Sequence, residues 1–267
     1  MIGIVLLMLG GLSVFVLPCV RAGEAARWPQ EGDNVQVSGN LVLDVSHVSQ
    51  GYFLARVYEP ADRRLKLRVV TGQTTLDYDL PQTAEYIVVP LQMGSGTYEV
   101  TLYENTSGKS YMETGSISFY AELEREDAAF LYPNQYVDYT AQSPAVTKSD
   151  ELRQGRNDRE FFDASGEFII SEFAYDFIKA LTVKPGVLPQ IDECYEERLG
   201  VCQDLSAILC CMLRVQGIPA RLVIGYADEA YHAWVVAEID GQEVFYDPTV
   251  RMGAMKEPSE YSVERYY

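Results

Sequence analysis

The feature that most constrains the fold is the alternation of apolar and polar residues between positions 35 and 123. Short alternating runs recur through this stretch, and Gly, Asn, Asp or Pro separates most of them; they lie at 35–37, 41–45, 53–58, 65–69, 76–78, 86–89, 98–102 and 116–120. A period of two is typical of strands that bury one face. The runs predict roughly seven short strands, in an immunoglobulin-like β-sandwich over residues 33–123.

A change of period marks a second part of the chain. Residues 124–166 are rich in charged and turn-forming side chains, and we interpret them as a linking segment. Apolar residues then recur at helical spacing, at Phe168, Ile169, Phe173, Phe177 and Ile178. This spacing is typical of a helix that turns one face towards a core. We therefore expect a second domain over residues 167–267, and an α+β protein as a whole.

The composition excludes several classes of function. The chain has 267 residues, with 39 acidic against 21 basic side chains and a formal net charge of −18. Nucleic-acid binding needs clustered Lys and Arg, so we expect no nucleic-acid partner. The chain has two histidines and no Cys-x-x-Cys run, which leaves no ligand set for a zinc site. We expect no metal and no cofactor, and any histidine-dependent chemistry must use His47 or His232.

A cysteine stands at the start of a predicted helix. The apolar face of this helix is formed by Leu205, Ile208, Leu209, Met212 and Leu213. Gly217 and Pro219 follow and end it. Cys202 therefore falls at the helix N-terminus, where unpaired backbone N–H groups and the helix dipole stabilise a thiolate. On its own, a cysteine in this position is more often a small core residue.

Three strands are predicted downstream, over residues 221–226, 231–236 and 244–249. His232 lies in the second strand and Asp247 in the third, and Asp240-Gly241 between them is a hairpin-turn signal. The two side chains should thus lie on adjacent antiparallel strands, with the strand ends facing Cys202. A thiol, an imidazole and a carboxylate in this arrangement are what nucleophilic catalysis needs.

Five sequence blocks of this region resemble the transglutaminase-like superfamily, the microbial branch of the papain-like cysteine enzymes. In order, they are Gly-Val-Cys-Gln-Asp, Met-Leu-Arg-Val-Gln-Gly-Ile-Pro-Ala-Arg, Ile-Gly-Tyr, His-Ala-Trp and Asp-Pro-Thr. Residues 130–136 are also similar to a lead-in segment of bacterial members. The resemblance implies a papain-like transglutaminase core, in which the helix that bears the cysteine packs on an antiparallel sheet.

Carried over to this chain, the resemblance implies that Cys202 is the nucleophile, His232 the general base and acid, and Asp247 the orienting group. The chemistry of the family is attack on a carboxamide or peptide carbonyl to give a thioester, which water or an amine resolves without a cofactor. Two positions depart from the family pattern. Leu205 stands where many relatives have an aromatic residue, and Gln203 stands where Arg or an aromatic residue is common. These departures bear on substrate shape more than on the triad.

The other cysteines of this region are expected to be bystanders. Cys210 and Cys211 lie about 12–13 Å beyond Cys202 along the same helix, too far for a disulfide, and should pack as small apolar groups. Cys194 lies in an acidic loop and is interpreted as a partly buried thiol. A regulatory disulfide between Cys194 and Cys202 is the alternative.

The first residues indicate export. Residues 2–17 are apolar apart from glycines and Ser13, and Val20-Arg21-Ala22 offers a small-x-small cleavage pattern. We expect residues 1–22 to be a cleaved signal peptide or a retained anchor that attaches the protein to a membrane, with lipidation at Cys19 as a further alternative. In each case the body of the protein is extracellular or at the cell surface.

These observations predict an exported thiol enzyme that acts on amide bonds in a protein or peptide substrate. Hydrolysis is favoured over transamidation, because water is the default acceptor and no sequence feature indicates an amine channel. The alternative is a non-catalytic surface adaptor, which would keep the transglutaminase-like shape for binding and use the sandwich for contacts.

Overall fold

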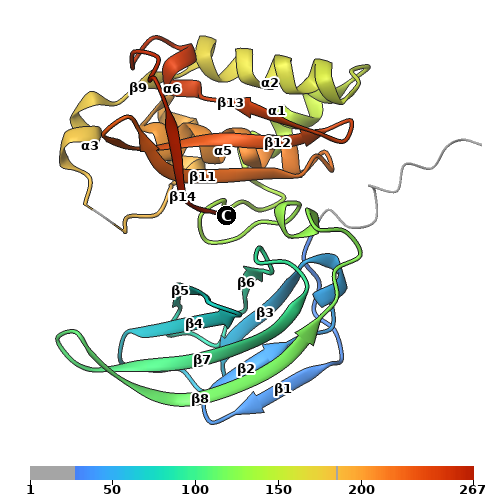
Figure 1. Cartoon of the computed structure of the whole chain (residues 1–267), viewed down its shortest axis with the longest axis vertical. Coiled ribbons are helices and arrows are strands. Elements are labelled where there is room, and N and C mark those ends of the chain that lie inside the picture. Colours follow the sequence, from blue (N-terminus) through green and yellow to red (C-terminus); the bar gives the residue numbers. More distant parts are fainter. Residues whose placement is uncertain (1–27, 185) are drawn as a thin grey trace, which may run out of the picture.

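The computed structural model describes residues 28–184 and 186–267, so the predicted signal peptide or anchor at 1–22 lies outside the described residues. The chain forms two halves, an all-β half drawn below and a mixed half drawn above in Figure 1. We call residues 28–123 the N-terminal half and residues 124–267 the C-terminal half. Among the described residues, no helix is both long enough and apolar enough to cross a membrane.

The N-terminal half consists of two four-stranded antiparallel sheets, with strand orders β1-β2-β3-β6 and β5-β4-β7-β8. The strands are β1 (Val35–Ser38), β2 (Leu41–Asp44), β3 (Tyr52–Val57), β4 (Leu65–Thr71), β5 (Thr74–Leu80), β6 (Ile87–Pro90), β7 (Gly96–Ser107) and β8 (Ser110–Ala121), with a short 3-10 helix η1 (Val48–Gln50). Inward side chains of both sheets, such as Leu43, Phe53, Val69 and Val100, share one core. Each predicted run forms a strand, because side chains two residues apart point to the same face. The immunoglobulin-like type stays a prediction.

The C-terminal half places helices around a four-stranded antiparallel sheet of order β13-β12-β11-β14. These strands are β11 (Ala220–Ala227), β12 (Ala230–Ile239), β13 (Gln242–Tyr246) and β14 (Tyr261–Tyr266). Two short strands, β9 (Ala174–Tyr175) and β10 (Leu199–Gly200), form a separate parallel ladder. The mixed fold with antiparallel sheets agrees with the prediction.

One helix lies at the centre of this half. The helices are α1 (Pro144–Arg153), α2 (Asp158–Glu172), α3 (Phe177–Thr182), α4 (Ile191–Glu197), α5 (Cys202–Arg214) and α6 (Pro248–Arg251), with a 3-10 turn η2 (Ala128–Phe130). Every residue of α5 from Asp204 to Arg214 is buried. This helix packs on β11 and β12 and also contacts α1, α2, α4 and α6. The start of α5 is therefore held in place from several sides.

The segment interpreted as a linker contains two helices. α2 begins at Asp158 because Asn157 and Glu160 form a capping box, in which each side chain accepts a hydrogen bond from the other's backbone N–H. In α1, Ser149 is fully buried. The expected boundary at residue 167 lies inside α2, and the division of the chain into domains stays a prediction.

The predicted helical stripe is also wrong beyond the end of α2. Phe173 is extended (φ −116°, ψ 154°), and the chain then enters β9. The ladder with β10 competes with the helix, since the Asp176 N–H donates to the Gly200 carbonyl at 2.9 Å. Phe177 and Ile178 belong to the separate helix α3 and are 59% and 77% exposed instead of facing a core.

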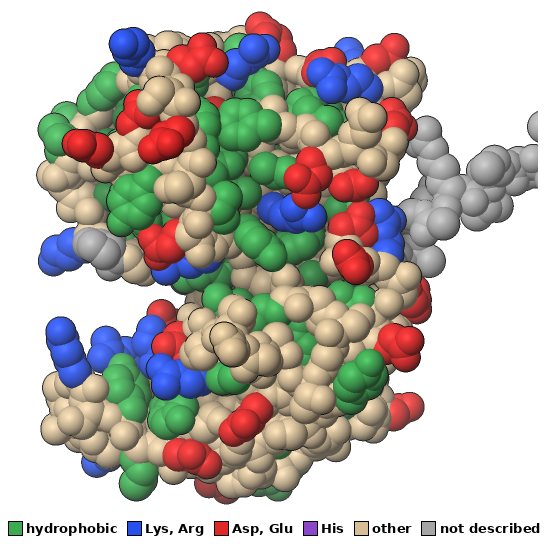
Figure 2. All heavy atoms as spheres, in the orientation of Figure 1, with side chains coloured by type: hydrophobic (Ala, Val, Ile, Leu, Met, Phe, Trp, Pro, Cys, Tyr) green, Lys and Arg blue, Asp and Glu red, His purple; other side chains and the backbone are tan. Residues whose placement is uncertain are grey.

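The two halves are joined by a limited set of contacts. The side-chain amide of Gln92 donates to the Tyr266 carbonyl, and the rings of Tyr52 and Tyr132 lie 4.5 Å apart between centroids. Figure 2 shows the molecule hollowed between the halves on one side. The contacts therefore cover only part of the facing surfaces.

Candidate active site

Cys202 is the first residue of α5. The helix begins there because Val201 is extended and the Asp204 side chain accepts a hydrogen bond from the Val201 N–H at 3.0 Å. At this position the Cys202 N–H has no partner within the helix, and the positive end of the helix dipole lies beside the sulfur. Among the described cysteines, Cys202 is the one that is not fully buried. It is therefore the thiol that a substrate can reach.

Asp204 connects the start of α5 to neighbouring segments through hydrogen bonds. It is fully buried, and it also accepts hydrogen bonds from Lys179 Nζ at 2.7 Å and from the Gln190 N–H at 3.4 Å. Lys179 belongs to α3, and Gln190 precedes α4. Because a buried carboxylate is unfavourable unless it is paired, these bonds hold three segments around Cys202. Burial opposes the lysine charge, but the bond to Asp204 and its charge raise the pKa of Lys179.

β12 and β13 bring His232 and Asp247 together. The hairpin turns at Asp240-Gly241, with φ angles of 53° and 75°, as the turn signal predicted. The register pairs Val235 with Tyr246, so Asp247 follows β13 beside the part of β12 that carries His232. Both side chains are buried, and His232 Nε2 lies 2.8 Å from Asp247 Oδ2. The juxtaposition expected from the sequence is present.

The three side chains also interact electrostatically. The Cys202 side chain lies close enough to the His232 ring to affect its pKa. Because Asp247 contacts Nε2, Nδ1 is the ring nitrogen that remains for the sulfur. Burial opposes the imidazolium, but the hydrogen bonds to Asp247 and Cys202 and their charges raise the pKa of His232 to about 9. Burial also opposes the carboxylate, yet the bond to His232 and its charge lower the pKa of Asp247. The arrangement favours a protonated His232 ring between the Asp247 carboxylate and the Cys202 side chain.

Residues 146–248 match the family model of the transglutaminase-like superfamily. The matched span begins in α1, contains the whole of α5, and includes Cys202, His232 and Asp247. The chain contains a transglutaminase-like domain. A comparison with curated proteins finds no match.

Solved structures similar to this chain include two candidate proteases and a transglutaminase. A candidate cysteine protease from Cytophaga hutchinsonii is 17% identical with a TM-score of 0.43, over 81% of this chain and 75% of that one. A candidate protease from Parabacteroides distasonis is 15% identical with a TM-score of 0.36, over 74% and 37%. Red sea bream transglutaminase is 13% identical with a TM-score of 0.28, over 74% and 48%. The chain spans less than half the length of the last two proteins.

A tyrosine outside the matched span contacts the carboxylate of the transglutaminase-like domain. Tyr261, the first residue of β14, donates from its hydroxyl to Asp247 Oδ2 at 2.8 Å. Oδ1 of the same carboxylate accepts from the N–H groups of Thr249 and Val250 at 2.9 and 3.1 Å. Trp234 packs on the Tyr261 ring with centroids 5.0 Å apart. Sequence reasoning missed Tyr261; the only available signal was the short alternating run that predicts its strand.

A second tyrosine lies beside Cys202 of the transglutaminase-like domain. The β9–β10 ladder pairs Tyr175 with Gly200, and the Tyr175 hydroxyl lies next to Cys202, which affects its pKa. Burial and the neighbouring Cys202 raise the pKa of Tyr175 to about 12. Tyr175 therefore stays a neutral hydroxyl next to the N–H that would face an oxyanion. No motif in the sequence indicates this residue.

The remaining residues that the sequence singled out lie outside the triad. His47 stacks on Tyr52 in the N-terminal half, with ring centroids 5.5 Å apart. Cys210 and Cys211 are fully buried in α5, as predicted. Cys194 lies in α4 and is buried, so the expectation of a partly buried thiol in a loop is wrong. The described cysteines are all free, and the described residues contain no group of acidic, His and Cys side chains that could hold a metal ion.

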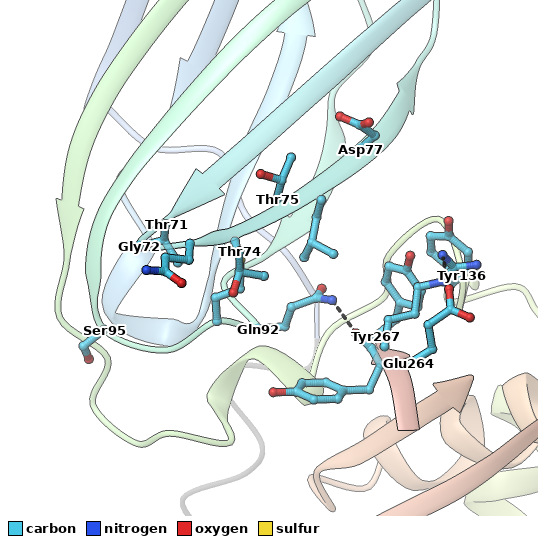
Figure 3. Close-up of a pocket in the computed structure, with 15 residues that line it drawn as sticks. Thr71, Gly72, Thr74, Thr75, Asp77, Gln92, Ser95, Tyr136, Glu264 and Tyr267 are labelled. Carbon is cyan, nitrogen blue, oxygen red and sulfur yellow. Dashed lines mark hydrogen bonds and ion pairs between the residues drawn. The ribbon is translucent and has the colours of Figure 1, made fainter. Parts of the chain in front are cut away.

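A large pocket lies between the two halves instead of at the triad (Figure 3). Its volume is about 950 Å³, and it is lined by residues 71–77 of the β4–β5 hairpin, by residues 264–267 and by Gln92, Met93, Ser95 and Tyr136. None of the three triad residues lines it. The pocket is therefore separate from the chemistry of the transglutaminase-like domain.

Proposed function

We propose that the protein is an exported thiol enzyme that acts on amide bonds in protein or peptide substrates through a Cys202-His232-Asp247 triad. The observation that carries the proposal is the buried contact of 2.8 Å between His232 and Asp247. The His232 ring also interacts with the Cys202 side chain at the start of α5. The family of the domain, which includes enzymes of this chemistry, supports it.

Each triad residue has a defined role in the proposed reaction. The Cys202 thiolate attacks the amide carbonyl carbon, and the backbone N–H groups at the start of α5 stabilise the developing oxyanion. The His232 imidazolium gives its proton to the leaving amine, so that a thioester remains on Cys202. Asp247 keeps the ring oriented and stabilises its positive charge. His232 then removes a proton from the incoming water, which cleaves the thioester and restores the thiolate.

Hydrolysis is the proposed outcome, with transamidation as the alternative fate of the same thioester. Water is the acceptor unless a site excludes it, and the half-buried Cys202 is open to solvent. An amine acceptor would need a surface that holds it beside the thioester. The two outcomes share the acylation step and differ only in the second nucleophile.

The N-terminal half is proposed to be an immunoglobulin-like support for the enzyme. The chain passes from one sheet to the other after β3, β5 and β6, a kind of crossover that immunoglobulin-like sandwiches share. Residues 1–22 are proposed to direct export, as a cleaved signal or as a membrane anchor. The protein would then act outside the cell or at its surface.

The test is to incubate the full-length protein with a peptide library, with and without a primary amine, and to identify products by mass spectrometry. We expect cleaved peptides with the wild type and none with Cys202→Ala. The two histidines provide a matched pair, since His232→Ala should lose turnover and His47→Ala should keep it. Equal turnover in Cys202→Ala would overturn the proposal. A wild type without turnover would favour the non-catalytic adaptor.

A further inference from the structure

Four large apolar side chains are exposed beside the start of α5. Phe177, Ile178 and Leu181 on α3 are 59%, 77% and 89% exposed, and Val187 in the following segment is 44% exposed. We call these four residues the apolar patch. Ile178 and Leu181 are the two most exposed large hydrophobic side chains among the described residues. Single exposed apolar residues are ordinary, but a group of them indicates an interaction site.

The apolar patch is connected directly to the nucleophile. The ring of Phe177 lies 5.0 Å between centroids from the ring of Tyr175, and Tyr175 lies next to Cys202. On the other side, the side-chain amide of Gln203 donates to the Val187 carbonyl at 3.0 Å. The patch is thus continuous with the residues that flank the thiol, in the region where α3 is labelled in Figure 1.

The position of the patch relative to Cys202 is fixed. A six-residue helix is not stable by itself, so neighbouring contacts must hold α3 in place. The Asp176 side chain accepts hydrogen bonds from the N–H groups of Ile178 and Lys179 at 3.0 and 2.8 Å. Lys179 in turn forms an ion pair with Asp204 on α5, whose carboxylate is fully buried. The apolar side chains therefore lie on a helix whose position is fixed by these contacts.

We propose that the apolar patch recognises a large apolar side chain of the peptide that acylates Cys202. The inference rests on the proposed function and specifies its substrate class: peptides with a residue such as Leu or Phe close to the attacked amide. Tyr175 spans the gap between Cys202 and Phe177, so the recognised side chain lies roughly two to three extended residues from the carbonyl, at about 3.3 Å per residue.

A substrate peptide fits the surface better than a membrane does. Asp176 caps α3, and Glu193 and Asp204 interact with Lys179, the basic residue of this helix, while the chain as a whole carries a net charge of −18. Negative charge of this kind repels an anionic lipid surface but accommodates a neutral or basic peptide. Continuity with the thiol also favours the substrate over a second copy of the chain, which would cover the entrance to Cys202.

The test compares two surface variants with the wild type, all full-length. Ile178→Ser combined with Leu181→Ser removes the most exposed part of the patch, and Tyr120→Ser is the control, since Tyr120 on β8 is 65% exposed in the other half. Peptide pairs that differ by Leu or Ser two or three residues from the cleaved bond provide the readout. We expect the Leu/Ser ratio of kcat/KM to fall about tenfold in the double variant and to stay unchanged in the control.

The outcomes separate this inference from the proposed function. An unchanged Leu/Ser ratio in the double variant, with active wild type, overturns the inference and leaves the proposed function intact. No turnover of any peptide by the wild type overturns the proposed function. A wild-type dimer in sedimentation that becomes monomeric in the double variant would assign the patch to self-association. Binding to phosphatidylglycerol vesicles that the double variant loses would assign it to a membrane, and both results would contradict the inference.

Discussion

At the scale of residues, Asp247 is the most heavily bonded group of the candidate site. Oδ2 contacts both His232 and Tyr261, and Oδ1 accepts two backbone N–H groups of α6. A carboxylate held on both oxygens cannot rotate, so it sets the plane of the His232 ring. Tyr261 is thereby a positioning residue that acts through Asp247.

Tyr261→Phe removes one hydrogen bond to Asp247 Oδ2 and leaves the packing on Trp234. We expect the free energy of unfolding to fall by about 1–2 kcal/mol, the usual contribution of a hydrogen bond to a charged group. The pKa of His232 should rise, because Oδ2 no longer shares its charge with a second donor. Urea unfolding and NMR titration of the ring check both effects. Tyr120→Phe, at an exposed tyrosine of the N-terminal half, is the control and should change neither quantity.

The His232 ring should titrate with a pKa of about 9, raised from the ordinary 6.5. Because the folded state binds this proton more tightly, its stabilisation is complete below pH 6.5 and is lost as the pH rises through about 9. The two histidines make the NMR titration simple, and His47→Gln assigns the signals. Asp247→Asn should lower the pKa of His232 and flatten the decline of melting temperature over this pH range. A His232 pKa at or below 6.5 in the wild type would contradict the expectation.

At the scale of elements, Asp204 links α3, the segment before α4 and the start of α5. Asp204→Asn places an amide N–H₂ next to N–H donors, so at least one of its hydrogen bonds is lost. We expect the free energy of unfolding to fall by about 1–3 kcal/mol, measured by urea unfolding at pH 7. Asp163→Asn is the matched control, since it breaks an exposed ion pair with Arg159. An equally large loss of unfolding free energy in Asp163→Asn would show that the buried hydrogen bonds of Asp204 contribute no more than an exposed ion pair.

The elements that were predicted correctly share one property: residues close together in the sequence determine them. The strands of the N-terminal half follow from period two, and the approach of His232 to Asp247 follows from one hairpin with a recognisable turn. α1 escaped prediction because its buried residues include polar ones. Ser149 is buried because its hydroxyl donates to the Met212 carbonyl at 2.7 Å, a contact 63 residues away that no local pattern encodes.

The missed site residues have the same cause. Tyr261 reaches Asp247 only because β14 pairs with β11, and Tyr175 reaches Cys202 only through the β9–β10 ladder. Strand pairing between distant segments depends on the whole fold, so the type of these residues gave no indication of their place. The exposed residues of α3 were assigned to a core for the complementary reason, because helical spacing alone does not reveal which face is covered.

At the scale of the whole molecule, the two halves are expected to unfold together. Buried side chains of both belong to one continuous core, and the rings of Tyr78 and Tyr267 meet across the junction with centroids 6.4 Å apart. In a Trp28→Phe variant, Trp234 fluorescence should report the C-terminal half, and far-UV circular dichroism should report both halves. We expect coincident urea transitions from the two probes. Two separated transitions would show that each half is independently stable.

The central claim is that His232 and Asp247 activate Cys202 as a nucleophile, and site-resolved alkylation tests it most directly. The protein is treated with iodoacetamide at pH 7, and the modification of each cysteine is followed over time by peptide mass spectrometry. We predict that Cys202 is modified much faster than Cys194, Cys210 and Cys211, and that His232→Ala slows it while His47→Ala does not. A Cys202 rate no higher than that of glutathione, or one unchanged by His232→Ala, would contradict the claim.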